Sequence, residues 1–193
     1  RLHRAEAREV ARKSLVLLKN QNDTLPLNKQ ARIALVGPLA KAPIDIMGSW
    51  AAAGQPAQSV TVFDGMRNAI AQQDNLIYAR GANITDDQSV VDYLNFLNFD
   101  APEVVDDPRP AQVLIDEAVK AANDADVIVA AVGESRGMSH ESSSRTDLNI
   151  PQSQRDLIKA LKATGKPLVL VLMNGRPLSI LEENQQADAI LET

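Results

Sequence analysis

The chain has 193 residues, which is enough for one domain, or for one domain with a short arm. Hydrophobic residues make up 45% of it and aromatic residues only 3%, so a core must be built from aliphatic side chains. A formal net charge of −5 argues against nucleic-acid binding, the lack of cysteine excludes disulfides and thiolate chemistry, and no segment approaches the roughly 20 unbroken apolar residues of a membrane span.

The first 30 residues are interpreted as an arm that leads into the domain. Apolar residues recur at helical spacing between Ala7 and Leu18, which predicts a helix over residues 3–18. Polar residues 20–23 break this pattern, and Leu-Pro-Leu at 25–27 begins an extended linker. Because the chain does not begin with Met, we expect it to be a piece of a longer polypeptide.

Five short apolar runs predict buried strands. They span residues 32–36, 76–78, 127–132, 168–173 and 189–191. Helical patterns lie between the strands, at residues 64–73, 111–123, 152–163 and 177–182. This alternation predicts an α/β fold: a mostly parallel sheet with helices on both faces, or α/β sandwich. We assign residues 31–193 to it and expect it to be incomplete at its C-terminus, where the chain stops after a strand.

Residues 86–110 interrupt the alternation and are interpreted as an insertion with one short helix and a loop. Phe96 and Phe99 lie within it, which predicts that the insertion packs against another part of the protein. At the helix starting near residue 64, Asp64 is interpreted as the N-cap.

One polar loop, residues 133–147, follows the most apolar strand. It contains two Glu, one Asp, two Arg, five Ser and one of the two His residues of the chain. In parallel sheets, functional residues gather in the loops after the carboxyl ends of strands. The length of this loop and its density of titratable groups favour a functional site over a solvated surface loop.

Three other kinds of site fit this chain poorly. Residues 133–137 match the G-x-S-x-G nucleophile elbow, but no helix follows at once and no His comes after His140. His140 is adjacent to Glu141, which is not the spacing of a zinc site, so we interpret it as a hydrogen-bonding loop residue and expect no metal. Residues 37–40 lack the glycine pattern of a nucleotide-binding site, so we expect no cofactor. The same residues are apolar, whereas a flavodoxin-like regulatory domain would need an acidic pocket there, so this type of domain is disfavoured.

The loop nevertheless resembles a known one. Glu141-Ser-Ser-Ser-Arg-Thr-Asp-Leu-Asn-Ile-Pro, preceded by Gly133-Glu134, is similar to the acid/base loop of family 3 glycoside hydrolases, above all bacterial periplasmic β-glucosidases. Four other stretches resemble the same family in the expected order. They are residues 11–20 with 25–27, residues 33–38, Gly-Ser-Trp at 48–50, and Asn-Gly-Arg-Pro-Leu at 174–178. Together the five motifs span nearly the whole chain.

The resemblance implies a retaining, exo-acting β-glucosidase without a cofactor, located in the periplasm. It implies that Glu141 is the general acid/base, and that Glu134, Arg145 and Asp147 support the loop, the last two by ion pairing. An N-terminal (β/α)8 barrel would supply the Asp nucleophile, and residues 1–30 would be the helical arm and linker from it. The substrate would be a β-glucoside or oligosaccharide, and the present chain alone would be inactive.

Several alternatives stay open. Trp50 is interpreted as a residue that packs between loop and sheet, the alternative being an aromatic platform that contacts a sugar. Arg176 is interpreted as a structural turn residue. The second function hypothesis is a non-catalytic sugar-binding or interaction module, in which Glu141 is an ordinary loop residue. The sequence leaves the sugar and the oligomeric state undecided.

Overall fold

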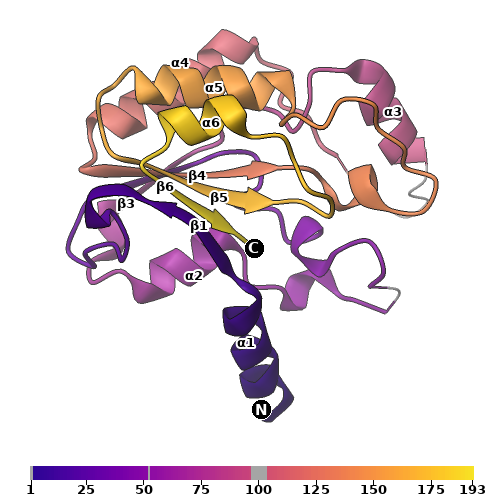
Figure 1. Cartoon of the computed structure of the whole chain (residues 1–193), viewed down its shortest axis with the longest axis horizontal. Helices are drawn as coiled ribbons and strands as arrows, with labels where there is room; N and C mark the ends of the chain where they lie inside the picture. The colour runs from indigo at the N-terminus through magenta and orange to yellow at the C-terminus, as the bar shows by residue number, and fades with distance from the viewer. Residues whose placement is uncertain (1, 52, 97–103) are drawn as a thin grey trace.

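The computed structural model describes residues 2–51, 53–96 and 104–193, and its centre is one six-stranded sheet (Figure 1). The strands are β1 (Val16–Asn20), β2 (Ile33–Val36), β3 (Leu76–Ala79), β4 (Val127–Gly133), β5 (Leu168–Met173) and β6 (Ala189–Glu192). Their order across the sheet is β1-β6-β5-β4-β2-β3, and every neighbouring pair is parallel except β1 with β6. This arrangement confirms the predicted α/β fold with a mostly parallel sheet.

Helices cover both faces of the sheet. They are α1 (Leu2–Ser14), α2 (Val62–Ala69), α3 (Gln88–Phe96), α4 (Ala111–Asn123), α5 (Gln152–Lys162) and α6 (Leu181–Gln186). Figure 1 shows α4, α5 and α6 over one face and α2 over the other, while α1 projects away from the body. The predicted sandwich of helices around a sheet is therefore present.

The core lies on the two faces of the central strands. Along β2, Ala34 and Val36 face a cluster shared with α4 and α5, whereas Ile33 and Leu35 face a second cluster that contains residues of α2 and α3. All residues of β4 are buried, as expected for a strand covered on both sides. Such strands have no exposed face, which leaves the loops at their carboxyl ends to carry chemistry.

The first 30 residues differ from the sequence interpretation. The helix predicted over residues 3–18 ends at Ser14, and β1 pairs antiparallel with β6. Leu15 and Leu18 are spaced as on a helix face, but the long-range pairing decides the structure of this short apolar run. The side chain of Lys19 also ties β1 to the end of α6, donating to the carbonyl oxygens of Asn184 at 2.5 Å and Ala187 at 2.6 Å. Residues 16–20 are therefore part of the sheet and not of a linker.

Two further boundaries are corrected. Helix α2 begins at Val62 with Thr61 as its N-cap, and Asp64 closes a capping box as the third helical residue instead of being the cap itself. Helix α6 begins at Leu181 because Ser179 forms an extended bridge with Asn149.

The insertion forms the predicted short helix, α3, and packs against the second core cluster as predicted, through Val91 and Leu94, although Phe96 is 77% exposed. Phe99 lies outside the described residues. None of the helices in the described ranges is long and apolar enough to cross a membrane.

Candidate active site

The loop that follows β4 begins at the carboxyl edge of the sheet, where the loops after β2 and β5 also begin. A short 3₁₀ turn, Arg136–Ser139, starts the loop. The loop after β2 is fastened to it, because Ser49 Oγ donates to the carbonyl oxygen of Arg136 at 2.6 Å and Arg136 N donates to Asp45 Oδ1 at 2.9 Å. The loop after β2 and the loop after β4 are thus joined at one edge of the sheet.

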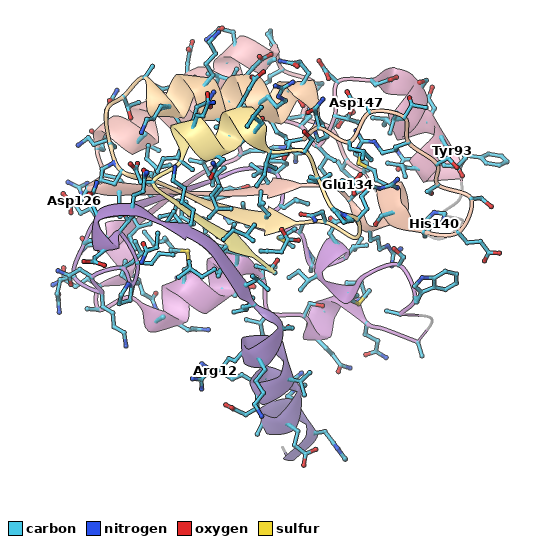
Figure 2. The ribbon with its side chains drawn as sticks, in the orientation of Figure 1. Arg12, Tyr93, Asp126, Glu134, His140 and Asp147 are labelled. Carbon is cyan, nitrogen blue, oxygen red and sulfur yellow. The ribbon has the colours of Figure 1, made fainter. Side chains whose placement is uncertain are left out.

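Glu134 is the buried centre of this region. Its side chain is fully buried, Arg145 Nη1 lies 2.6 Å from its Oε1, and Arg176 Nε lies 3.3 Å from the same oxygen. A carboxylate buried without a cation would be strongly disfavoured, so the two arginines make this placement possible. Figure 2 shows Glu134 at the base of the loop and His140 near its outer end. Glu134 can therefore support the loop but cannot reach a solvent-borne substrate.

Arg145 and Asp147 hold the far end of the loop in different ways. Arg145 forms its ion pair with Glu134. Asp147 Oδ1 accepts hydrogen bonds from Asn149 N at 2.9 Å and from Asn149 Nδ2 at 2.6 Å. The bond from the Asn149 backbone is the main cause that keeps the pKa of Asp147 below its ordinary value, with a smaller contribution from the Arg145 charge. Asp147 thus acts as a local turn-former in this loop.

Glu141 sits at the tip of a tight turn. Ser143 N donates to the carbonyl oxygen of His140 at 3.0 Å, and Ser142 has a φ of +67°, so Glu141 and Ser142 are the two central residues of this turn. His140 Nδ1 lies 2.5 Å from the carbonyl oxygen of Glu141, and His140 Nε2 lies 3.3 Å from Ser143 Oγ. His140 therefore braces the turn, and the Glu141 residue is exposed.

Trp50 is 74% exposed. The interpretation that it packs between the loop and the sheet is therefore wrong. Its neighbour Ser49 is bound to the β4 loop, as described above, which keeps the indole near the same edge of the sheet.

Two features beside the loop are not predictable from the sequence pattern. Arg176, in the turn after β5, donates from Nη2 to the carbonyl oxygen of Ser143 at 2.9 Å and to that of Met138. A cavity of about 590 Å³ opens on the other side of the loop, between residues 142–147 and helix α3. Within the part of the chain that the structure describes, no three His, Asp or Glu side chains gather to hold a metal.

Comparison with known proteins identifies the family and agrees with the fold. The model of the glycosyl hydrolase family 3 C-terminal domain matches residues 15–193. The chain belongs to this family. A periplasmic β-glucosidase of Salmonella typhimurium is 64% identical over the whole chain, and a β-xylosidase of Formosa agariphila is 33% identical over 99% of it. Both relatives are longer, so that the chain spans 25% and 24% of their lengths.

Solved structures of bacterial β-glucosidases share the fold. A β-glucosidase of Listeria innocua, in complex with isofagomine, is 31% identical with a TM-score of 0.81, over 98% of this chain and 22% of that protein. A family 3 β-glucosidase of Bifidobacterium adolescentis is 30% identical with a TM-score of 0.74, over 99% of this chain and 24% of that protein. Both matches agree with the family that the five sequence motifs predict.

Proposed function

We propose that Glu141 is the general acid/base of a retaining, exo-acting β-glucosidase that removes terminal β-D-glucosyl residues. One observation carries this proposal. Of the three carboxyl groups in the loop, Glu134 is buried between two arginines, whereas Asp147 and Glu141 are both exposed, and Asp147 is bound by Asn149. Among the described residues, no side chain bonds to the Glu141 carboxyl group. It is the carboxyl group of this loop that is free to meet a substrate.

The chemistry needs a carboxyl group of this kind. In the first step a nucleophilic carboxylate attacks the anomeric carbon, while Glu141 gives its proton to the glycosidic oxygen and the aglycone leaves as an alcohol. In the second step the Glu141 carboxylate takes a proton from water, whose oxygen attacks the anomeric carbon and releases the nucleophile. In retaining enzymes the two carboxyl groups lie roughly 5–5.5 Å apart.

The nucleophile is assigned to the part of the full-length protein that this chain does not span. We propose that it is an Asp of an N-terminal (β/α)8 barrel, which docks at the carboxyl edge of the sheet, so that the sugar binds between the domains. Helix α1 would be the arm that leads in from that barrel, because β1 already belongs to the sheet. The exposed indole of Trp50 is proposed to contact a sugar ring through its face.

The sugar and the compartment follow from the relatives. The 64% identical relative is named a periplasmic β-glucosidase, whereas the β-xylosidase is only 33% identical. This difference in identity supports glucose over xylose. The name of the first relative supports a periplasmic location for the full-length protein.

The test is the Glu141→Gln variant of the full-length protein on two substrates. A β-linked glucose disaccharide has a poor leaving group that needs the proton, whereas dinitrophenyl β-glucoside has a good one that does not. We expect a loss of about 10²- to 10⁴-fold on the disaccharide and a much smaller loss in the pre-steady-state release of dinitrophenol. Glu182→Gln, which changes an exposed glutamate of α6, is the matched control and should leave both rates unchanged.

Unchanged rates of Glu141→Gln on both substrates would contradict this assignment. The non-catalytic sugar-binding or interaction module would then be the better account of the domain.

A further inference from the structure

The turn after β5 reaches under the loop that carries Glu141. Asn174 Nδ2 donates to the carbonyl oxygen of Arg176 and to Glu192 Oε1, both at 2.8 Å, which fixes the turn to the end of β6. Gly175 packs directly against the loop: a Cβ atom at this glycine would lie 2.0 Å from Ser139 Oγ and 2.9 Å from Ser139 Cβ. The turn is thus a fixed support for residues 138–143.

Arg176 contacts the loop at three points. Its Nη2 donates to the carbonyl oxygens of Met138 and Ser143, and its Nε lies 3.3 Å from Glu134 Oε1. Met138 and Ser143 stand on the two sides of the turn whose tip is Glu141. One planar guanidinium therefore sets the separation of the two sides and also fastens them to the buried Glu134. A lysine ammonium is a point charge on a flexible stem and cannot reproduce this fork.

We propose that Arg176 is a positioning residue for Glu141: it fixes the turn so that the Glu141 carboxyl group meets the glycosidic oxygen, without touching the substrate itself. This proposal rests on the proposed function of Glu141. A displacement of about 1 Å in a reacting group can lower the rate about 100-fold, so a loosened turn would chiefly slow the proton transfer from Glu141. Glu134 keeps its ion pair with Arg145 when Arg176 is replaced, so the buried carboxylate is not left without a cation.

The test is Arg176→Lys in the full-length protein, with the same two substrates. We expect kcat on the β-linked disaccharide to fall about 10- to 100-fold, while the pre-steady-state release of dinitrophenol from dinitrophenyl β-glucoside stays within about 3-fold. A role confined to stability would lower both rates by the same factor, in proportion to the loss of folded protein, and that outcome would overturn the proposal.

Arg155 offers a matched control. Its side chain is 21% exposed against 19% for Arg176, and it also pairs with a buried glutamate, Glu183, at 2.9 Å. Its hydrogen bonds go to side chains of α5 and α6 and not to the carbonyl oxygens of the loop. Arg155→Lys should therefore show no difference between the two substrates. A substrate-dependent loss in this variant as large as that of Arg176→Lys would overturn the assignment to Arg176.

A double variant separates this proposal from the one on which it rests. If Arg176 acts through Glu141, adding Arg176→Lys to Glu141→Gln causes no further loss on the disaccharide. If Glu141→Gln has its expected effect and Arg176→Lys has none on either substrate, the positioning role fails and the function of Glu141 stands. If Glu141→Gln itself shows no dependence on the leaving group, the proposed function fails.

Discussion

Two glycines allow the loops to leave the sheet where they do. Gly37 follows β2 with a φ of +106°, and Gly133 ends β4 with a φ of +135°. A Cβ atom at Gly37 would lie 2.2 Å from the carbonyl oxygen of Ala131, and one at Gly133 would lie 2.1 Å from that of Met173. A side chain at either position would therefore be strained in its backbone and would also collide with the neighbouring strand.

We predict that Gly37→Ala destabilises the protein by more than about 2 kcal/mol, because the strained φ and the collision act together. Gly65→Ala is the matched control, since Gly65 is exposed within α2 and a Cβ there meets no atom within 4 Å. That variant should gain about 0.5–1 kcal/mol. Thermal unfolding of the full-length protein measures both changes. A Gly37→Ala variant as stable as Gly65→Ala would mean that β2 and β4 do not approach so closely.

Sequence alone predicts part of the site at this scale. Glu141 and Glu134 were found because a family motif contains them, but the sequence did not distinguish an exposed from a buried carboxylate. Burial of Glu134 depends on Arg176, whose other partners, Met138 and Ser143, precede it by 38 and 33 residues. No local pattern encodes contacts of that separation, which is why Arg176 was interpreted as a turn residue only.

Among the elements, β4 and β5 were predictable and β1 was not. The sequences of β4 and β5 are apolar on both faces because helices cover both sides of the sheet. Each strand therefore appears as a short, continuous run of apolar residues. Leu15 and Leu18 fit a helical spacing equally well, and only pairing with β6 makes residues 16–20 a strand. The predicted start of α6 was wrong for a similar reason, because the bridge between Asn149 and Ser179 joins distant segments.

Helix α5 is joined to the end of β4 through one buried side chain. Gln154 is fully buried, its Oε1 accepts from Gly133 N at 2.9 Å, and its Nε2 donates to the carbonyl oxygens of Gly133 at 2.9 Å and Ile84 at 2.7 Å. These bonds satisfy backbone groups just where β4 ends and the loop with Glu141 begins. The amide thus links the helix layer to the base of the candidate site.

We predict that Gln154→Leu destabilises the protein by about 2–4 kcal/mol, because it leaves buried backbone groups without partners. Gln152→Leu on the same helix is the control. Gln152 is exposed, and among the described residues its amide bonds to two side chains of its own helix, Asp156 and Arg155, so a change within about 0.5 kcal/mol is expected. Thermal unfolding compares the two variants. Equal stability of the two would show that the bonds to Gly133 and Ile84 contribute little.

For the whole molecule, the loops after β2, β4 and β5 meet at one edge of the sheet, and α1 projects from the body (Figure 1). The exposed Trp50 and Glu141 belong to two of these loops, and bonds from Ser49 and Arg176 tie the three together. The chain spans about a quarter of the length of its relatives. We propose that this edge presents Glu141 to a sugar held by the remainder of the full-length protein.

The most direct test is the product that Glu141→Ala forms in the full-length protein with dinitrophenyl β-glucoside and azide. Azide needs no base, so it can replace water in the second step when the acid/base is absent. We expect faster turnover with azide and β-glucosyl azide as the product, because the nucleophile still acts and two inversions retain the configuration. Formation of α-glucosyl azide would instead identify Glu141 as the nucleophile, and no acceleration by azide would contradict a role for Glu141 in the chemistry.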